Sequence, residues 1–160
     1  MSDDFYGGVD DEAAPTSAAD EATSAPESEE PTTHFGSADE FVRKQLIGTY
    51  RLRVMAQGSG AGLRWKAAWW ESKEAQQRIE ALWRAWEAAR ADPKAGMSAW
   101  WINHCDPHMS VLLSADGPFA DSTDENRLGE PLPYTAPVEG TFPSDLQPPL
   151  YTQRPSRENA

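Results

Sequence analysis

All seven tryptophans of this 160-residue chain lie between Trp65 and Trp101. An indole ring is large enough to bury roughly 150–250 Å² of surface, so a cluster of this density dominates the core of any domain that contains it. The regions on either side of the cluster contain no tryptophan at all. The cluster therefore predicts where the packed core lies, although it does not by itself indicate a reaction.

The charges divide the chain into unlike parts. Residues 1–40 contain twelve acidic side chains and no Lys or Arg, whereas residues 41–94 contain eleven basic side chains and five acidic ones. The first 34 residues are mainly Asp, Glu, Ala, Ser, Thr and Pro, which bury too little apolar surface to offset the entropy lost on ordering. We therefore expect a disordered acidic arm over residues 1–34.

Proline marks the other end of the chain. Seven of the thirteen prolines lie between Pro131 and Pro155. Because proline has no amide hydrogen, this stretch is a poor candidate for a helix or a central strand. We expect an extended or disordered tail over residues 121–160, which leaves residues 35–120 as the folded domain.

Helical spacing and capping residues predict the elements of that domain. Ser37 and Glu40 form a capping box before an apolar stripe, which predicts a helix over residues 38–50. Ser72 precedes a long amphipathic helix that ends near Pro93. A short helix with Ser98 as N-cap follows, and then one further turn over residues 108–113 capped by Asp106, for which a short strand is the alternative.

The stretch between the first two helices is ambiguous. Apolar and basic residues alternate on both sides of a glycine-rich turn at residues 58–62, which is compatible with a small hairpin. An irregular loop fits equally well, because no Asn-Gly or Asp-Gly pair specifies a turn type. The predicted fold is mainly α: a small Trp-rich domain of three to four helices with a possible short hairpin, flanked by disordered tails.

The cellular setting follows from what the sequence lacks. The single cysteine, Cys105, cannot form an internal disulfide, and the acidic N-terminus does not resemble a signal peptide. No run of about 18 apolar residues is present, so we expect no membrane span. A cytoplasmic location is the simplest interpretation.

An ordered set of aromatic, glycine and histidine positions carries a family resemblance. The set comprises Trp69-Trp70, the octet from Glu80 to Glu87, Gly96-Met97-Ser98, Trp100-Trp101, His104, Asp106, His108-Met109, Leu112-Leu113 and Gly117-Pro118-Phe119. Over about residues 35–119 the chain resembles DUF4913, an uncharacterised family spread over actinobacterial chromosomes, plasmids, integrative elements and phages. The resemblance implies a mobile element of a high-GC Gram-positive bacterium as the source, and it implies no established activity.

Two positions depart from the family pattern. Members of the family often have Cys-Pro after the first tryptophan, where this chain has Lys66-Ala67, and an acidic residue before the first histidine, where it has Asn103. Both departures remove side chains that a metal site would use.

The candidate partner-binding residues gather at the end of the tryptophan cluster. Trp100 and Trp101 are about 100° apart on a helix, so one of them can point outward, and burial of both is the alternative. Trp and Arg dominate the energetics of protein interfaces, which makes a surface indole near an arginine a candidate contact. The candidates for binding a protein partner are Trp100, Trp101, His104, Asp106, His108 and Arg84.

A second set of residues suits nucleic acid. Basic side chains next to tryptophans favour phosphate contacts and base stacking. The candidates are Arg43, Lys44, Arg51, Arg53, Arg64 and Lys66. The acidic arm would compete for the same surface, so a nucleic-acid-binding protein of this kind would be autoinhibited.

Metal binding and catalysis have weaker support in the sequence. His104, Asp106 and His108 are suitable zinc ligands, but Pro107 interrupts their helical spacing and the sequence supplies no fourth ligand group. A structural interpretation, with Asp106 as a helix cap, competes with the zinc site. No nucleophile with a base and an orienting group can be recognised, so we expect neither enzyme activity nor a cofactor.

Three hypotheses about function remain. The first is a non-enzymatic accessory or adaptor module that binds a protein partner through its Trp- and His-bearing face. The second is a nucleic-acid-binding accessory protein that uses the basic segment 41–94. The third is a zinc-dependent site at His104, Asp106 and His108.

Overall fold

The first helix begins at the predicted capping box. Ser37 Oγ accepts a hydrogen bond from Glu40 N at 3.2 Å. The Glu40 carboxylate in turn accepts a hydrogen bond at 2.7 Å from the backbone N–H of Gly36, the residue before the cap. The computed structural model describes residues 32–146, and in it the helical run comprises α1 (Ala38–Phe41), the π-helical segment η1 (Val42–Leu46) and α2 (Ile47–Thr49). Phe35 and Phe41, which flank the capping box, pack edge to face with their ring centres 5.7 Å apart, as in a hydrophobic staple.

The long helix α3 (Lys73–Ala89) follows a short 3₁₀ turn, η2 (Trp69–Glu71). Its N-cap is Ser72, whose hydroxyl accepts from Ala75 N at 3.3 Å, as the sequence predicts. Ala75, Ile79, Leu82 and Trp83 form its buried stripe. Trp86, which follows Trp83 by three residues on the same helix, is only partly buried and packs against Phe35 and Phe41.

The last helical run is continuous, which corrects two predicted caps. It comprises α4 (Gly96–Trp100), the π-helical segment η3 (Trp101–Cys105) and α5 (Asp106–Leu112). Ser98 lies inside α4 and not at its N-cap, and Asp106 lies within the run and caps nothing. The π-helical turn, in which Asp106 N donates to Trp101 O, widens the helix before Pro107, so the missing amide of the proline does not break it.

The glycine-rich stretch is a loop and not a hairpin. Between residues 32 and 146 the structure contains no β-strand, and the one contact of this type is an isolated parallel bridge between Val54 and Leu63. Gly58 and Gly60 have positive φ angles of 84° and 100°, and they reverse the chain without forming a paired ladder.

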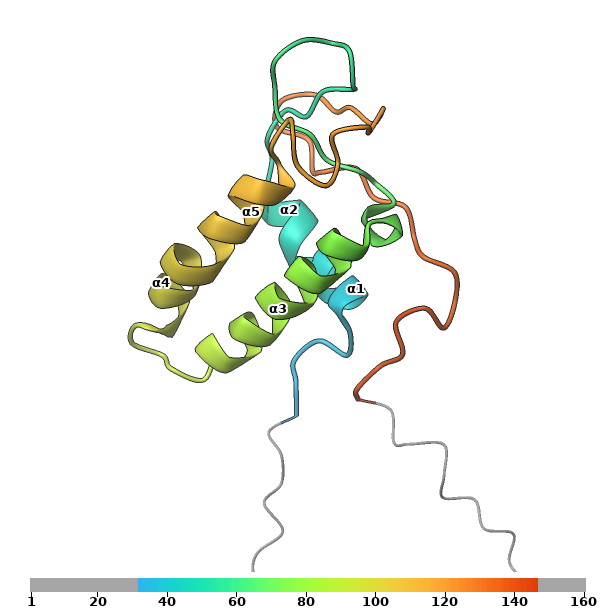
Figure 1. The fold of residues 1–160 in the computed structure, drawn as a ribbon. Helices are drawn as coiled ribbons and strands as arrows, with labels where there is room; N and C mark the ends of the chain where they lie inside the picture. Colours follow the sequence, from blue (N-terminus) through green and yellow to red (C-terminus); the bar gives the residue numbers. More distant parts are fainter. Residues whose placement is uncertain (1–31, 147–160) are drawn as a thin grey trace, which may run out of the picture. The chain divides into compact units, whose positions relative to one another are not determined.

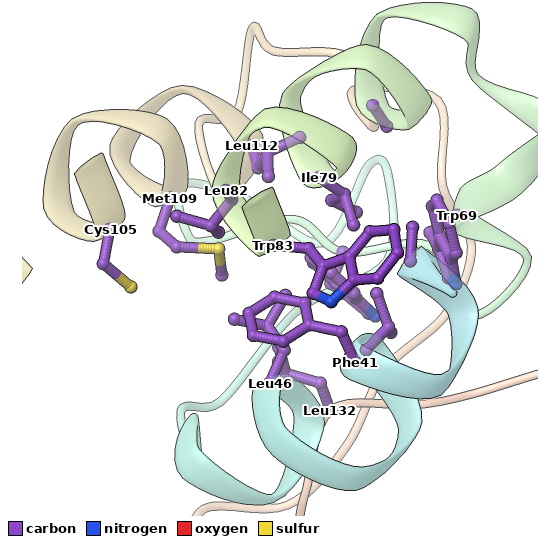
Figure 2. Packing of buried hydrophobic residues seen from close by; sticks show 14 of the residues in the cluster. Phe41, Leu46, Trp69, Ile79, Leu82, Trp83, Cys105, Met109, Leu112 and Leu132 are labelled. Atoms are coloured by element: carbon purple, nitrogen blue, oxygen red, sulfur yellow. The ribbon is translucent and has the colours of Figure 1, made fainter. Parts of the chain in front are cut away.

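The core lies where the three helical runs meet. Figure 1 shows α3 beside the run from α4 to α5, with α1 and α2 packed against them. Figure 2 shows Phe41 and Leu46 facing Ile79, Leu82 and Trp83 of α3, with Met109 and Leu112 closing the cluster. The mainly α fold is therefore confirmed. None of the described helices combines the length and the apolar character needed to cross a bilayer.

The segment from residue 121 to residue 146, called here the extended segment, is part of this packed domain. Leu132 is buried in the core, and Ser122 Oγ donates to Trp65 O at 2.7 Å. The segment has no regular secondary structure, but its amides pair with the helical part: Leu132 N donates to Ile47 O at 3.2 Å and Asp145 N to Gly36 O at 2.7 Å.

Tryptophans hold the extended segment in place. Trp65 Nε1 donates to Pro133 O at 2.9 Å, Trp70 Nε1 donates to Thr135 O at 3.1 Å, and the ring of Trp69 lies 5.1 Å from that of Phe142. The packed part of the chain therefore continues past the predicted domain boundary at residue 120. Sequence periodicity did not reveal these contacts, because the anchoring residues are scattered and no apolar stripe links them.

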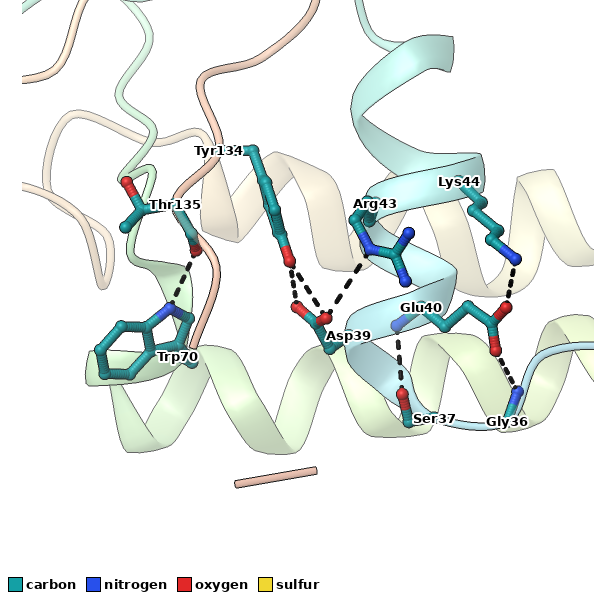
Figure 3. Close-up of polar contacts among 9 residues, drawn as sticks. All are labelled: Gly36, Ser37, Asp39, Glu40, Arg43, Lys44, Trp70, Tyr134 and Thr135. Carbon is teal, nitrogen blue, oxygen red and sulfur yellow. Dashed lines mark hydrogen bonds and ion pairs between the residues drawn. The ribbon is translucent and has the colours of Figure 1, made fainter. Parts of the chain in front are cut away.

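A polar cluster adds a further link between the extended segment and α1 (Figure 3). Tyr134 Oη donates to both carboxylate oxygens of Asp39, at 2.9 and 3.0 Å, and Arg43 Nε lies 4.0 Å from the same carboxylate. Burial raises the pKa of Asp39, and burial together with the Asp39 carboxylate raises the pKa of Tyr134 to about 12. The phenol therefore stays protonated and acts as a hydrogen-bond donor at neutral pH.

The predicted acidic arm lies outside the described residues up to residue 31, and so do residues 147–160 of the predicted tail. The last residues of the predicted arm are in contact with α3: Thr32 O accepts from Arg90 Nη2 at 3.0 Å and His34 N donates to Glu87 at 2.8 Å.

Candidate functional site

Two uncharged stretches of the chain meet at one place on the domain. Residues 45–50 and residues 95–105 contain no Asp, Glu, Lys or Arg, although a quarter of the whole chain is charged. The ends of these stretches touch: the rings of Tyr50 and Trp101 are 6.1 Å apart, and Tyr50 Oη lies 3.2 Å from Cys105 Sγ. We call the surface formed by Tyr50, Trp101 and Ile102, with Ser98 and Ala99 one turn before Ile102, the uncharged face.

The two adjacent tryptophans have different roles. Trp100 is buried, and its Nε1 donates to Leu82 O at 3.1 Å, which pins α4 to α3. Trp101 is only partly buried and contacts Tyr50 at the edge of the uncharged face. The predicted partner-binding role is therefore open to Trp101, whereas Trp100 is part of the core.

Ile102 is the residue that the sequence-based prediction missed. Its side chain is 67% exposed, and it lies on η3 directly after the two tryptophans. Tyr50 was also not among the predicted candidates. The signal that could have identified both residues was the absence of charge over residues 45–50 and 95–105, because a surface without charged side chains is characteristic of the centre of a protein interface.

The thiol of Cys105, which lies next to Tyr50 of the uncharged face, has low reactivity. Burial raises the pKa of Cys105 to about 11; the Tyr50 hydrogen bond opposes this in part, and the nearby Asp106 carboxylate adds a smaller upward effect. Burial likewise raises the pKa of Tyr50 above its ordinary value. A protonated thiol is a weak nucleophile, so the Tyr50–Cys105 contact contributes packing and a hydrogen bond.

His104 and His108 lie on one unbroken helix, contrary to the interruption predicted at Pro107. His104 is exposed and His108 is partly buried, with a buried Nδ1 that has no hydrogen-bond partner within residues 32–146. Burial lowers the pKa of His108, and the positive charges of Arg78 and His104 lower it further. In the part of the chain that the structure describes, no three His, Cys, Asp or Glu side chains converge as metal ligands.

Arg84 belongs to a different surface from the one predicted. Its guanidinium lies 4.0 Å from the centre of the Trp83 ring and forms ion pairs with Glu80 at 2.9 Å and Asp145 at 2.6 Å. Asp145 is in the extended segment, so Arg84 helps to attach this segment to α3. The cation of α3 that acts on His108 is Arg78.

Most of the six predicted nucleic-acid-binding residues already form ion pairs or hydrogen bonds within the domain. Arg43 and Lys44 pair with Asp39 and Glu40 on the preceding turn, and Lys66 pairs with Glu71 at 2.9 Å. Arg64 is buried and donates to Gly60 O at 2.9 Å.

The two remaining cations of this set, Arg51 and Arg53, lie at the loop end of the domain. Arg51 donates to Gly129 O at 3.0 Å, and Arg53 lines a hollow between residues 53–59 and 125–130. Residues 32–146 as a whole contain twelve basic and fifteen acidic side chains.

The fold and the site together define a class: a small, mainly helical domain with an exposed uncharged face. The model of DUF4913, a domain of unknown function, matches residues 35–139. The chain belongs to this family. The match extends well past residue 120, in agreement with the place of the extended segment in the domain. No curated protein and no solved structure was found to be similar to the chain.

Proposed function

We propose that this protein is a non-enzymatic accessory module that binds a protein partner through the uncharged face. The observation that carries the proposal is Ile102, a large apolar side chain exposed to 67% that directly follows the partly buried Trp101 on η3, in a stretch of the chain, residues 95–105, without Asp, Glu, Lys or Arg. Interface centres are depleted of charge and enriched in aromatic residues, and their binding energy concentrates in a few such side chains.

The chemistry of the face restricts the partner. A surface built from Tyr50, Trp101 and Ile102 offers apolar area, one phenol and one indole N–H, and no cation to pair with phosphate. We therefore infer a partner with an apolar pocket or groove that accepts Ile102. Asp106 and His104, which flank Cys105 on the same helical run, provide a polar rim. Rims of this kind exclude water and set orientation.

The rigidity of the face supports the same function. Trp100 is fixed to α3 through its indole, and Cys105 is fixed to Tyr50, so both helical runs that form the face are held by buried contacts. A preorganised apolar surface loses little side-chain entropy on binding, which favours affinity. Nucleic-acid binding has less support, because most of the predicted cations are engaged within the domain.

The setting of this function is part of the proposal. We infer a cytoplasmic accessory protein of an actinobacterial mobile element. Genes beside this one that encode conjugation, phage or DNA-transfer proteins would support this setting.

Site-specific photo-crosslinking tests the proposal. A photoreactive phenylalanine at position 102, introduced in the host cell, is expected to trap one protein. The matched control is position 138, because Val138 is also apolar and exposed, at 73%, but lies in the extended segment. A partner trapped from position 102 and not from position 138 supports the proposal. Equal trapping from both positions, or nucleic acid as the species trapped from position 102, would overturn it.

A further inference from the structure

The last part of the extended segment, residues 142–145, lies against α3 and is called here the docked tetrapeptide. The ring of Phe142 packs on that of Trp69 with the ring centres 5.1 Å apart. Three residues later, the Asp145 carboxylate pairs with the Arg84 guanidinium at 2.6 Å. An aromatic anchor and a carboxylate held by an arginine are contacts by which domains recognise short peptides of other proteins.

The surface under the docked tetrapeptide is shaped to admit a peptide main chain. Asp145 N donates to Gly36 O at 2.7 Å, so the peptide is held through its backbone as well as its side chains. A Cβ at Gly36 would overlap Ser144 Oγ and lie 3.2 Å from Ser144 Cβ. The absence of a side chain at Gly36 therefore lets the tetrapeptide approach this closely.

The docked tetrapeptide is attached more loosely than the part of the extended segment before it. Thr135 is the last residue before it that is hydrogen-bonded to the rest of the domain. Within the described part of the chain, residues 136–141 form hydrogen bonds only with one another. The side chains of the Asp145 ion pair are 44% and 47% exposed, so solvent screens their attraction. Release of the tetrapeptide thus leaves the contacts up to Thr135 in place.

The docked tetrapeptide also leaves part of this surface unused. The indole N–H of Trp69 is buried without an acceptor among residues 32–146. Beside Phe142 lies an open hollow of about 420 Å³, which is lined on α3 by Gln76, Gln77, Glu80 and Ala81. A peptide with a larger aromatic side chain than Phe142 would fill more of this hollow and bury more apolar surface.

The family match separates this surface from its occupant. The match covers residues 35–139, which include Gly36, Trp69 and Arg84 and end before the docked tetrapeptide. The surface therefore belongs to the matched domain, whereas residues 142–145 lie beyond it. We call the surface formed by Gly36, Trp69, Arg84 and the adjoining hollow the α3 docking site.

We propose that the α3 docking site binds an extended peptide of a protein partner, in which an aromatic residue is followed three positions later by an acidic one. The docked tetrapeptide is then an internal competitor for this site, and the partner peptide displaces it. None of the residues of the site is part of the uncharged face, so this proposal stands or falls independently of the one above.

Binding of a synthetic peptide to the full-length protein tests the proposal. The probe is a fluorescein-labelled peptide with the sequence of residues 139–146, and its binding is measured by fluorescence anisotropy. In the wild type the tethered tetrapeptide competes at an effective concentration on the order of millimolar. F142S/D145N removes this competitor and should bind the probe at least about tenfold more tightly than the wild type. The matched control is V138S/E139Q, which changes two exposed residues of the connection and should bind the probe like the wild type.

A longer connection tests the same competition with the tetrapeptide unchanged. Inserting about twelve Gly and Ser residues between Glu139 and Gly140 makes the connection of residues 136–141 about three times as long. The effective concentration of the tetrapeptide then falls about fivefold, and the probe should bind about fivefold more tightly. Unchanged affinity in this variant would overturn the proposal even if F142S/D145N did not fold.

Further measurements with F142S/D145N examine the site and the chemistry of its ligand. Adding R84Q should weaken probe binding, whereas a probe carrying F142W should bind more tightly than the original. The probe should shift the amide signals of Gly36 and Ala81 and leave that of Ile102 unchanged, and the same spectrum reports that the variant is folded. Equal affinity of folded F142S/D145N and wild type for the probe, or shifts centred on Ile102, would contradict the proposal. Weaker binding of the F142W probe would contradict the ligand chemistry inferred from the hollow.

Discussion

At the scale of single residues, Glu87 shows how one side chain can organise several elements. Its carboxylate accepts from His34 N and Phe35 N, each at 2.8 Å, from Trp83 Nε1 at 3.0 Å and from Arg90 Nε at 2.6 Å. Burial alone would raise the pKa of Glu87, but these donors outweigh it and hold the pKa below its usual 4.5. The start of the described chain is thereby tied to α3.

We predict that Glu87→Gln destabilises the domain by about 2 kcal/mol at neutral pH, because donors to a charged acceptor lose more than donors to a neutral one. A folded-state pKa below the unfolded value contributes stability above about pH 4.5, and this contribution is lost as the pH falls through the folded value. Urea unfolding between about pH 3 and 7 should therefore show a smaller difference between variant and wild type at the acid end.

The control for this prediction is Glu74→Gln. Glu74 is an exposed residue paired with Arg78, so its replacement should change the unfolding free energy by no more than about 0.5 kcal/mol. An effect of Glu87→Gln that is as small as this, or that does not vary with pH, would contradict the role assigned to the carboxylate.

At the scale of elements, caps and periodicity predicted part of the fold correctly. Ser37 and Ser72 identified the starts of two helical runs, because a hydroxyl followed by an acidic turn is a local signal. The third run was misplaced, because Pro107 suggests a break unless the helix widens before it. The extended segment was missed as a packed element, since its contacts depend on distant tryptophans. The uncharged face also depends on two stretches meeting in space, so Ile102 and Tyr50 were not predicted.

A pair of glycine substitutions tests how α3 and α4 are joined. A Cβ at Gly96 would lie 1.9 Å from Ala89 O, so Gly96→Ala forces the backbone apart and should cost about 1–3 kcal/mol. A Cβ at Gly48, in α2, meets nothing within 4 Å, so Gly48→Ala should instead stabilise the protein by about 0.5–1 kcal/mol. Thermal unfolding measures the change in stability of both variants. Equal shifts in Tm for Gly96→Ala and Gly48→Ala would contradict the close approach of Gly96 to the Ala89 carbonyl.

At the scale of the whole molecule, the extended segment completes the domain. It covers Trp65, contacts Trp69 and supplies Leu132 to the core. The tryptophan cluster therefore packs against this segment as well as among the helices. The sequence clustering of the tryptophans located this core correctly. It did not reveal that part of what they bind lies more than 30 residues beyond the last of them.

Truncation tests this view. A chain ending at residue 146 should unfold cooperatively near the Tm of the full chain, because every described contact is retained. A chain ending at residue 120 should lose cooperative unfolding, since it exposes Trp65 and Trp69 and removes Leu132, whose replacement by Ala alone should cost about 2–5 kcal/mol. Circular dichroism during heating distinguishes the two. A cooperative transition of unchanged Tm for the shorter chain would restore residue 120 as the domain boundary.

The central claim is that the uncharged face binds a protein, and its most direct test is the affinity of the partner trapped from position 102. We predict that Ile102→Asp raises the Kd of the purified pair by at least about tenfold, because a charge is then buried in an apolar contact. Val138→Asp, with the same chemical change on another exposed apolar residue, should leave the Kd within about twofold. Equal Kd values for the two variants would contradict the claim.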